Sequence, residues 1–169
     1  TMVAHYHGQI WNGAEPARAL GVSPPTVRRY LDLLTDALLL RQLQPWHANL
    51  GKRQVKSPKV YVRDSGLLHQ LLGLPTERAL LSHPKLGASW EGFVIEQVLA
   101  TEPHDEAWFW ATHQGAEIDL LLRRGDRVVE GLDVGDAGPG HVGFEPVRAL
   151  ERVRRRAAPV LGREHRQVQ

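Results

Sequence analysis

The sequence predicts a fold of the α/β (α+β) class, in which helices and a mixed sheet are divided between two modules. Apolar residues recur at helical spacing between residues 15 and 34, whereas residues 59–64 and 116–134 have the patterns of strands. Charge is also unevenly distributed, because residues 16–63 carry nine Lys or Arg against two acidic residues and residues 64–146 carry five against fourteen. This reversal predicts a basic module followed by an acidic one.

The overall composition is that of a globular protein and excludes several classes. Of 169 residues, 42% are hydrophobic and 24% are charged, which is typical of a folded chain. There is no cysteine, so disulfides and thiolate zinc sites are excluded. No apolar run is long enough to span a bilayer, and no signal peptide opens the chain. We therefore expect a cytoplasmic protein with no membrane partner.

A helix-turn-helix is predicted by residues 15–34, EPARALGVSPPTVRRYLDLL. Gly21 can take the positive φ that a sharp turn between helices requires. Ser23 is a suitable N-cap for the second helix, and Pro24 falls at its first position, where a missing N–H does no harm. The apolar residues of this helix recur every three or four positions and should face the core; they are Val27, Tyr30, Leu31 and Leu34.

A pair of strands joined by a basic loop follows and completes the pattern of a winged helix. LLLRQLQPW is strand-like, and KVYVRD alternates apolar and polar residues from Lys59 onward, so the loop between them predicts a wing. The start of the second helix of a helix-turn-helix enters the DNA major groove, and basic residues in a wing can lie along phosphates. We therefore expect DNA contact by Thr26, Arg28, Arg29, Lys52, Arg53 and Lys56. The alternative is a winged helix that binds protein or serves structure alone.

The next part of the chain predicts helices and then a strand. SGLLHQLLGL indicates a helix capped by Ser65 and closed by Gly73, and TERALLSHPKLG indicates one helical turn and a loop. SWEGFVIEQVLATE is a longer helix with Ser89 as its N-cap and Glu91 in its first turn, where the helix dipole favours a carboxylate. Its apolar stripe consists of Trp90, Phe93, Val94 and Val98. EAWFWATHQG then predicts a strand rich in aromatic residues.

The final predicted element is a hairpin, AEIDLLLRRGDRVVEGLDV, with carboxylates on both arms. With a two-residue turn at residues 125–126, the residues on either side of the turn pair, and Asp119 lies opposite Leu132. Glu130 is then a diagonal neighbour of Asp119, close enough for one Mg²⁺ to bridge the two carboxylates. With a loop one residue longer, every side chain changes face, and the Asp119 face then shows Gly131 and Asp133.

A nuclease site of this kind also needs a lysine beside the second carboxylate, because an ammonium group positions the attacking water and balances developing charge. Neither register supplies one. The last lysine of the chain is Lys85, so only an arginine such as Arg123 could substitute. The constellation is incomplete.

From about Ala4 to about Leu132 the chain resembles the C-terminal part of a prokaryotic family of AAA+-type ATPases. The resemblance is carried by GVSPPTVRRYLDLL, PWHANLGKRQVKSPKVYVRDSGLLHQLLGL, HPKLGASWEGFVIEQVL and THQGAEIDLLL. It implies an N-terminal P-loop module, a winged helix and a domain of unknown function with a PD-(D/E)XK nuclease-like fold. It also implies nuclease-like positions at Glu91, at Asp119 and at a glutamate-x-lysine pair near residues 131 and 133, where this sequence has Gly and Asp.

Two departures from that family bear on activity. No G-x-x-x-x-G-K-[ST] motif occurs, so ATP would bind only through an N-terminal module that this sequence lacks. Beyond Asp133 the resemblance fades into a Gly/Pro-rich segment and an Arg-rich end, which fits either a basic tail or a truncated or frame-disturbed gene product. The nine histidines show no metal-binding spacing, and we expect them to be solvated or part of the core.

The sequence thus predicts a winged helix-turn-helix over residues 1–74, a linker over 75–84, a nuclease-like domain over 85–145 and a basic tail over 146–169. Three functions remain open. The first is a DNA-associated C-terminal portion of an AAA+-type ATP-binding protein with an inactive nuclease-like domain. The second is a Mg²⁺-dependent DNA nuclease that uses Asp119 and Glu130, with Glu91 nearby and an arginine in place of the lysine. The third is a regulatory or assembly module that docks on a partner ATPase.

Overall fold

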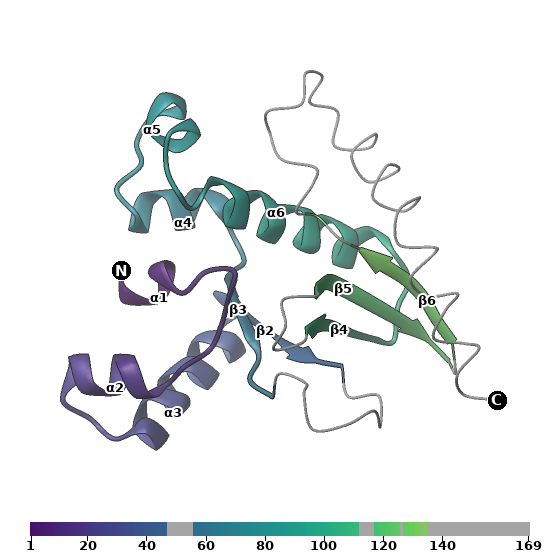
Figure 1. Ribbon diagram of the computed structural model, residues 1–169, viewed down its shortest axis with the longest axis horizontal. Coiled ribbons are helices and arrows are strands. Elements are labelled where there is room, and N and C mark those ends of the chain that lie inside the picture. Colours follow the sequence, from purple (N-terminus) through teal and green to yellow (C-terminus); the bar gives the residue numbers. More distant parts are fainter. Residues whose placement is uncertain (47–55, 112–116, 126, 133, 135–169) are drawn as a thin grey trace. The chain divides into compact units, whose positions relative to one another are not determined.

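The computed structural model describes residues 1–46, 56–111, 117–125, 127–132 and 134 of the chain (Figure 1). The predicted mixed α+β class is confirmed, since helices occur together with parallel and antiparallel strand pairs. The chain divides into two compact units, one of residues 1–43 and 57–93 and the other of residues 44–56 and 94–169. The boundaries predicted from the sequence remain predictions, and the predicted basic tail lies outside the described residues.

The first unit begins with three helices and a short strand. α1 (Met2–His5) is followed by β1 (Gln9–Ile10), α2 (Ala14–Leu20) and α3 (Pro24–Asp36). The purple and blue helices α2 and α3 lie side by side and pack on each other (Figure 1). The predicted pair of helices with a short turn is confirmed.

Two strands follow α3 and pair with each other, as predicted. β3 (Lys59–Val62) pairs antiparallel with β2 (Leu40–Pro45), with Leu40 opposite Val62 and Leu43 opposite Lys59. On its other side β3 pairs antiparallel with β1. β3 is therefore the middle strand of this unit.

The remaining helices are α4 (Ser65–Leu71), α5 (Glu77–Leu81) and α6 (Leu86–Thr101). All three were predicted, but two of their caps were predicted wrongly. The N-cap of α4 is Asp64, whose carboxylate accepts the Leu67 N–H at 2.6 Å, and not Ser65. α6 begins at Leu86, three residues before the predicted N-cap Ser89, so Ser89 lies buried inside the helix.

The core of the first unit collects side chains from helices and strands that are distant in sequence. It consists of Ala4, Leu31, Leu40, Val60, Val62 and Leu68. The central β3 is buried on both faces, and even Lys59 is only 4% exposed. The strand predicted from Lys59 onward is present, but its residues are buried on both faces, because it has partner strands on both sides.

The second unit contains the end of β2, the second half of α6 and three more strands. β2 pairs in parallel with β4 (Glu106–Ala111), and Gln44 of β2 lies opposite Trp108 of β4. β4 then pairs antiparallel with β5 (Glu117–Arg124), and β5 with β6 (Arg127–Leu132). The strands β4, β5 and β6 are drawn as adjacent arrows in Figure 1. The predicted aromatic strand and hairpin are confirmed.

The register of the hairpin follows the first predicted alternative next to the turn and the second one further along. Arg124 pairs with Arg127 across the short turn, as predicted. An irregularity then follows, because Arg123 pairs with Val128 but Leu122 pairs with Glu130, which adds one residue to β6. Leu132 consequently lies opposite Leu120 and not opposite Asp119, which is the register predicted for a loop one residue longer.

Candidate functional site

The turn between α2 and α3 has the chemistry that the sequence predicted. Gly21 adopts φ 66°, and its N–H donates to the carbonyl of Arg18 at 3.3 Å. The Oγ of Ser23 accepts the N–H of Thr26 at 3.4 Å, and Pro24 occupies the first helical position. These contacts fix where α3 begins and therefore which side chains its first turns present.

Two arginines lie on the first turns of α3 and are exposed to solvent. The Nε of Arg28 lies 3.2 Å from Oδ1 of Asp32, one turn further along, and Arg29 is exposed beside it. An ion pair in this exposed position is worth little, because water screens it. Thr26 is half-buried, and its hydroxyl lies 2.9 Å from Oγ of Ser23. The predicted DNA-contacting residues of α3 are thus close together on one short stretch.

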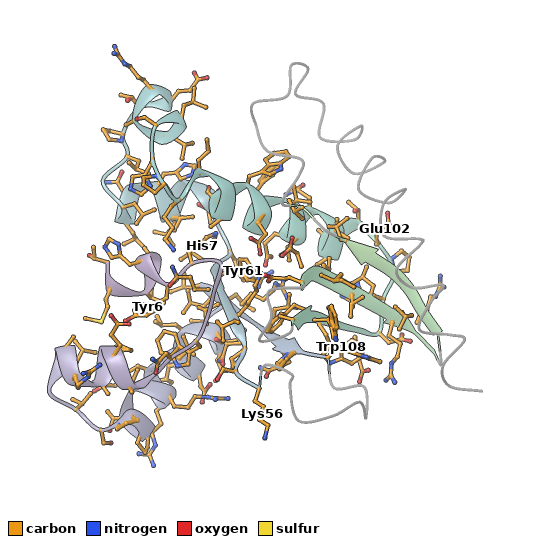
Figure 2. The ribbon with its side chains drawn as sticks, viewed as in Figure 1. Tyr6, His7, Lys56, Tyr61, Glu102 and Trp108 are labelled. Atoms are coloured by element: carbon orange, nitrogen blue, oxygen red, sulfur yellow. The ribbon has the colours of Figure 1, made fainter. Side chains whose placement is uncertain are left out.

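The predicted wing is described only at its end. Lys56 is exposed, and Figure 2 shows its side chain directed away from the strands. Lys52 and Arg53 lie outside the described residues. Lys56 is therefore the one predicted basic residue of the wing that the structure describes, and it belongs to the second unit.

Polar contacts hold α3 against β2. The side-chain amide of Gln42 donates to Oδ1 of Asp32 at 2.9 Å and to Oγ1 of Thr35 at 3.0 Å. Val27 and Leu31 are buried on the same helix. Because Asp32 accepts from both Arg28 and Gln42, it links the exposed arginine to the strand beneath the helix.

The rest of the exposed surface of α3 is more apolar than the sequence predicted. Tyr30 was predicted to face the core but is 50% exposed, because the buried stripe of α3 is narrow. Leu33 is 63% exposed, and Leu38, just beyond the helix, is 68% exposed with φ 59°. A positive φ at a non-glycine residue is a strained backbone state. This region therefore holds apolar side chains in solvent.

The two helices of the turn carry no net charge. α2 and α3 contain three arginines and three acidic residues, which are Glu15, Arg18, Arg28, Arg29, Asp32 and Asp36. The basic excess that the sequence shows over residues 16–63 thus lies mainly in β2, the loop and β3. One member of that excess, Lys59, is buried and paired, so it is not part of a cationic surface.

Lys59 belongs to a buried polar cluster with Glu91 and Tyr61. Its Nζ lies 2.9 Å from Oε1 of Glu91, and the hydroxyl of Tyr61 donates a short hydrogen bond to the same oxygen. Lys59 and Tyr61 share a face of β3 because they are two residues apart, and Glu91 comes from α6. Glu91, predicted as a nuclease-like position, here joins the first part of α6 to β3.

His7 forms a second buried link in the same unit, and Figure 2 shows it beside Tyr61. Its Nδ1 accepts the N–H of Val62 at 2.9 Å, and its Nε2 lies 2.9 Å from the carbonyl oxygen of Ala88, which can only accept. The ring is therefore neutral, with its proton on Nε2. Burial, together with the charges of Lys85 and His69, lowers the pKa of His7 to about 4, while the hydrogen bond to the Ala88 carbonyl opposes that shift. The expectation of a core histidine is correct here.

Two further titratable groups surround this cluster. Nζ of Lys85 donates to the carbonyl oxygen of His7 at 3.0 Å, and desolvation lowers the pKa of Lys85 while Glu91 opposes that shift. Nε2 of His69 lies 2.7 Å from Oγ of Ser89, and burial lowers the pKa of His69. The first unit therefore contains a network of buried polar links that the sequence did not predict.

The remaining nuclease candidates lie in the second unit. Asp119 is buried in β5, and its Oδ2 accepts the N–H of Val134 at 2.9 Å. The backbone of Glu130 lies opposite Leu122, three residues after Asp119 on β5. Because successive strand positions alternate between the two faces of a sheet, position 130 and Asp119 belong to opposite faces. Asp133 lies outside the described residues.

The predicted Mg²⁺ site stays a prediction, because Asp133 and the side chain of Glu130 lie outside what the structure describes. No three His, Cys, Asp or Glu side chains among the described residues come close enough together to hold a metal ion. Glu91 has as partners a lysine and a tyrosine from a strand about 30 residues earlier, and no local sequence pattern reveals such distant partners.

Comparison with known families assigns two domain types along the chain. Residues 1–78 match a family described as a domain of unknown function (DUF8612), and residues 86–130 match a second family described as a domain of unknown function (DUF4143). The two matches cover separate segments of the chain, and neither family description names an activity.

Two proteins of known sequence are close relatives of this chain over most of its length. They are proteins described as uncharacterized from Mycobacterium bovis and Mycobacterium tuberculosis, each 58% identical over 127 residues. The match covers 75% of this chain but only 29% of each relative, so the chain spans less than a third of their length. No solved structure matches the chain. Among the described helices, none has the length and apolar character needed to cross a bilayer.

Proposed function

We propose that this chain is the DNA-contacting C-terminal portion of a longer, cytoplasmic AAA+-type ATP-binding protein. In this proposal the first unit is a winged helix, and the second is a nuclease-like scaffold without cleavage activity. The observation that carries the proposal is the start of α3, where a glycine turn and a serine cap present Arg28 and Arg29 to solvent. The two helices joined by a short turn and the strand pair that follows support the proposal of a winged helix.

The proposed contact with DNA is mainly electrostatic. Each arginine that meets a phosphate releases a condensed counterion, so binding should weaken steeply as salt rises. Arg28 and Arg29 lie on consecutive positions and Lys56 lies at the end of the β2–β3 loop. Thr26 lies one turn nearer the start of α3, where short side chains in helix-turn-helix proteins approach bases. Lys52 and Arg53 would add charge from the loop sequence.

The proposal includes no nucleolytic step, for two reasons. At residues 131 and 133, where the family resemblance implies a glutamate and a lysine, this sequence has Gly and Asp. The lysine such a site requires does not occur in the sequence after Lys85. The nucleotide would likewise be bound by another part of the longer protein, because this sequence has no P-loop.

The test is binding of duplex DNA at several salt concentrations. Arg28→Ala with Arg29→Ala should weaken binding about tenfold or more and reduce the slope of log affinity against log salt by about two, since each lost phosphate contact removes about 0.9 from it. Arg78→Ala, at an exposed position of α5, is the matched control and should leave binding unchanged. Equal affinity of the double variant and the control would overturn the proposal.

One observation favours a second candidate, an assembly module that docks on a partner ATPase. The surface of α3 carries Tyr30 and Leu33 exposed, together with as many acidic residues as basic ones over α2 and α3. Such a surface suits protein contact at least as well as DNA contact. If duplex DNA fails to bind while a purified P-loop module binds, and Leu33→Gln abolishes that binding, the second candidate replaces the first.

A further inference from the structure

The exposed side of α3 has a regular arrangement of residues. At about 100° per residue, Arg29 and Asp36 lie seven positions apart on one flank of this side, and Tyr30 and Ala37 lie seven positions apart on the other. Leu33 lies between the two flanks. All five residues are exposed, and Leu33 is 63% exposed. The apolar edge is extended by Leu38, which the turn after the helix holds in solvent.

We propose that this side of α3 pairs with α3 of a second copy of the chain, antiparallel, about a two-fold axis close to Leu33. In an antiparallel pair each flank faces the same flank of the other helix, in reverse order. Arg29 of one copy then meets Asp36 of the other, and the same contact forms twice. Tyr30 likewise packs over Ala37 of the other copy, and the two Leu33 side chains meet at the axis.

The occupant is argued from the charges on the helix itself. Arg29 and Asp36 carry opposite charges at positions that a two-fold axis brings together, so the face is complementary to itself. Neither residue forms an ion pair within the described part of the chain, whereas Arg28 and Asp32 pair with each other along the helix. A partner surface that carried only positive or only negative charges would place a like charge opposite Arg29 or Asp36.

The expected dimer is weak. α3 has 13 residues and is therefore about 20 Å long, and a contact between two such helices falls below the roughly 1,200 Å² of a stable interface. We therefore expect dissociation in the micromolar range. The proposal does not depend on DNA binding, although Arg29 takes part in both.

Sedimentation velocity over a range of protein concentrations tests the proposal. The wild-type chain should pass from monomer to dimer, and Leu33→Gln should weaken dimerisation about tenfold or more. Arg29→Asp and Asp36→Arg should each weaken it as well, because each places like charges opposite one another. The double variant, Arg29→Asp with Asp36→Arg, should restore dimerisation. Such a rescue would show that the single variants had lost the charge contact and not their fold.

The control is Leu81→Gln, which removes a leucine that is 54% exposed on α5 and should leave dimerisation unchanged. A chain that stays monomeric at about 0.3 mM, far above a micromolar dissociation constant, would overturn the proposal. Dimers that persist in Leu33→Gln, or single charge reversals that the double variant does not rescue, would overturn it too. So would a monomer whose α3 face binds a P-loop module instead.

Discussion

Two hydrogen-bonded backbone groups hold the ring of His7 in its neutral form. Nδ1 must stay unprotonated to accept the N–H of Val62, and the proton on Nε2 is fixed by the carbonyl of Ala88. Removing the ring would leave both backbone groups buried without these contacts, at about 1–3 kcal/mol each. The residue therefore connects the end of α1 to β3 and α6.

This arrangement makes the first unit sensitive to acid. Burial lowers the pKa of His7 to about 4 from 6.5, so between these values the unfolded chain binds a proton that the folded chain does not. Stability is therefore complete above pH 6.5, falls as the pH drops towards 4, and loses about 3 kcal/mol in all. In urea titrations followed by tryptophan fluorescence, His7→Gln should be less stable at pH 7 and lose much of this pH dependence.

His5→Gln is the control, because His5 is exposed on the same short helix. It should keep the full decline between pH 6.5 and 4. His69, whose pKa burial also lowers, contributes in the same direction and keeps the His7→Gln profile from being flat. If His7→Gln retained the wild-type pH dependence, the assignment of a neutral, buried His7 would be wrong.

Among the helices and strands, α6 offers the sharpest comparison because it contains two glycines in different surroundings. A Cβ added at Gly92 would lie 2.7 Å from Nε2 of His7 and 3.2 Å from Cδ1 of Tyr61. A Cβ added at Gly87 would meet no atom within 4 Å. The first glycine therefore allows the helix to approach β3 closely, whereas the second serves no such purpose.

Substitution by alanine should separate the two. In a helix, alanine is favoured over glycine by about 1 kcal/mol, so Gly87→Ala should raise the free energy of unfolding by about that amount. Gly92→Ala should lower it, by about 1–3 kcal/mol, because the new methyl group clashes with the buried ring of His7. Urea unfolding of both variants gives the measurement. A stabilising Gly92→Ala would show that α6 does not pack so closely.

The elements that could be predicted are those specified by local chemistry. Gly21, Ser23 and Pro24 mark the turn and start of α3, and the structure has both where predicted. The start of α6 was missed because Ser89 has the character of a cap but instead bonds to His69. The hairpin turn was predicted, but the irregularity beyond it was not, because it arises from packing that no sequence pattern records.

The candidate site was less predictable than the fold, for a physical reason. Exposed arginines near a capped helix start follow from sequence, since they depend on positions a few residues apart. The cluster of Lys59, Tyr61 and Glu91 depends on residues about 30 positions apart, and a buried lysine contradicts the usual preference for solvent. Asp119 and Glu130 were brought together by the predicted hairpin register, which the irregularity in β6 changes. The sequence likewise could not show that Glu91 has a lysine and a tyrosine as partners.

At the scale of the whole molecule, the two proposals for α3 exclude each other on the same surface. Arg29 would contact phosphate in one and Asp36 of a second copy in the other. Duplex DNA should therefore shift the protein from dimer to monomer, and dimerisation should weaken DNA binding at high protein concentration by the same factor. Sedimentation with a labelled short duplex measures both. Duplex that binds without changing the dimer population would show that the two surfaces are separate.

The two units share the chain in an interleaved order, since it passes from one to the other after residues 43, 56 and 93. No single cut along the sequence can therefore separate them into intact halves. A fragment ending at residue 84, for instance, would lack the Glu91 carboxylate that pairs with Lys59 and the Ala88 carbonyl that contacts His7. Each unit includes residues that follow a segment of the other along the chain, so truncation at any point leaves at least one unit incomplete.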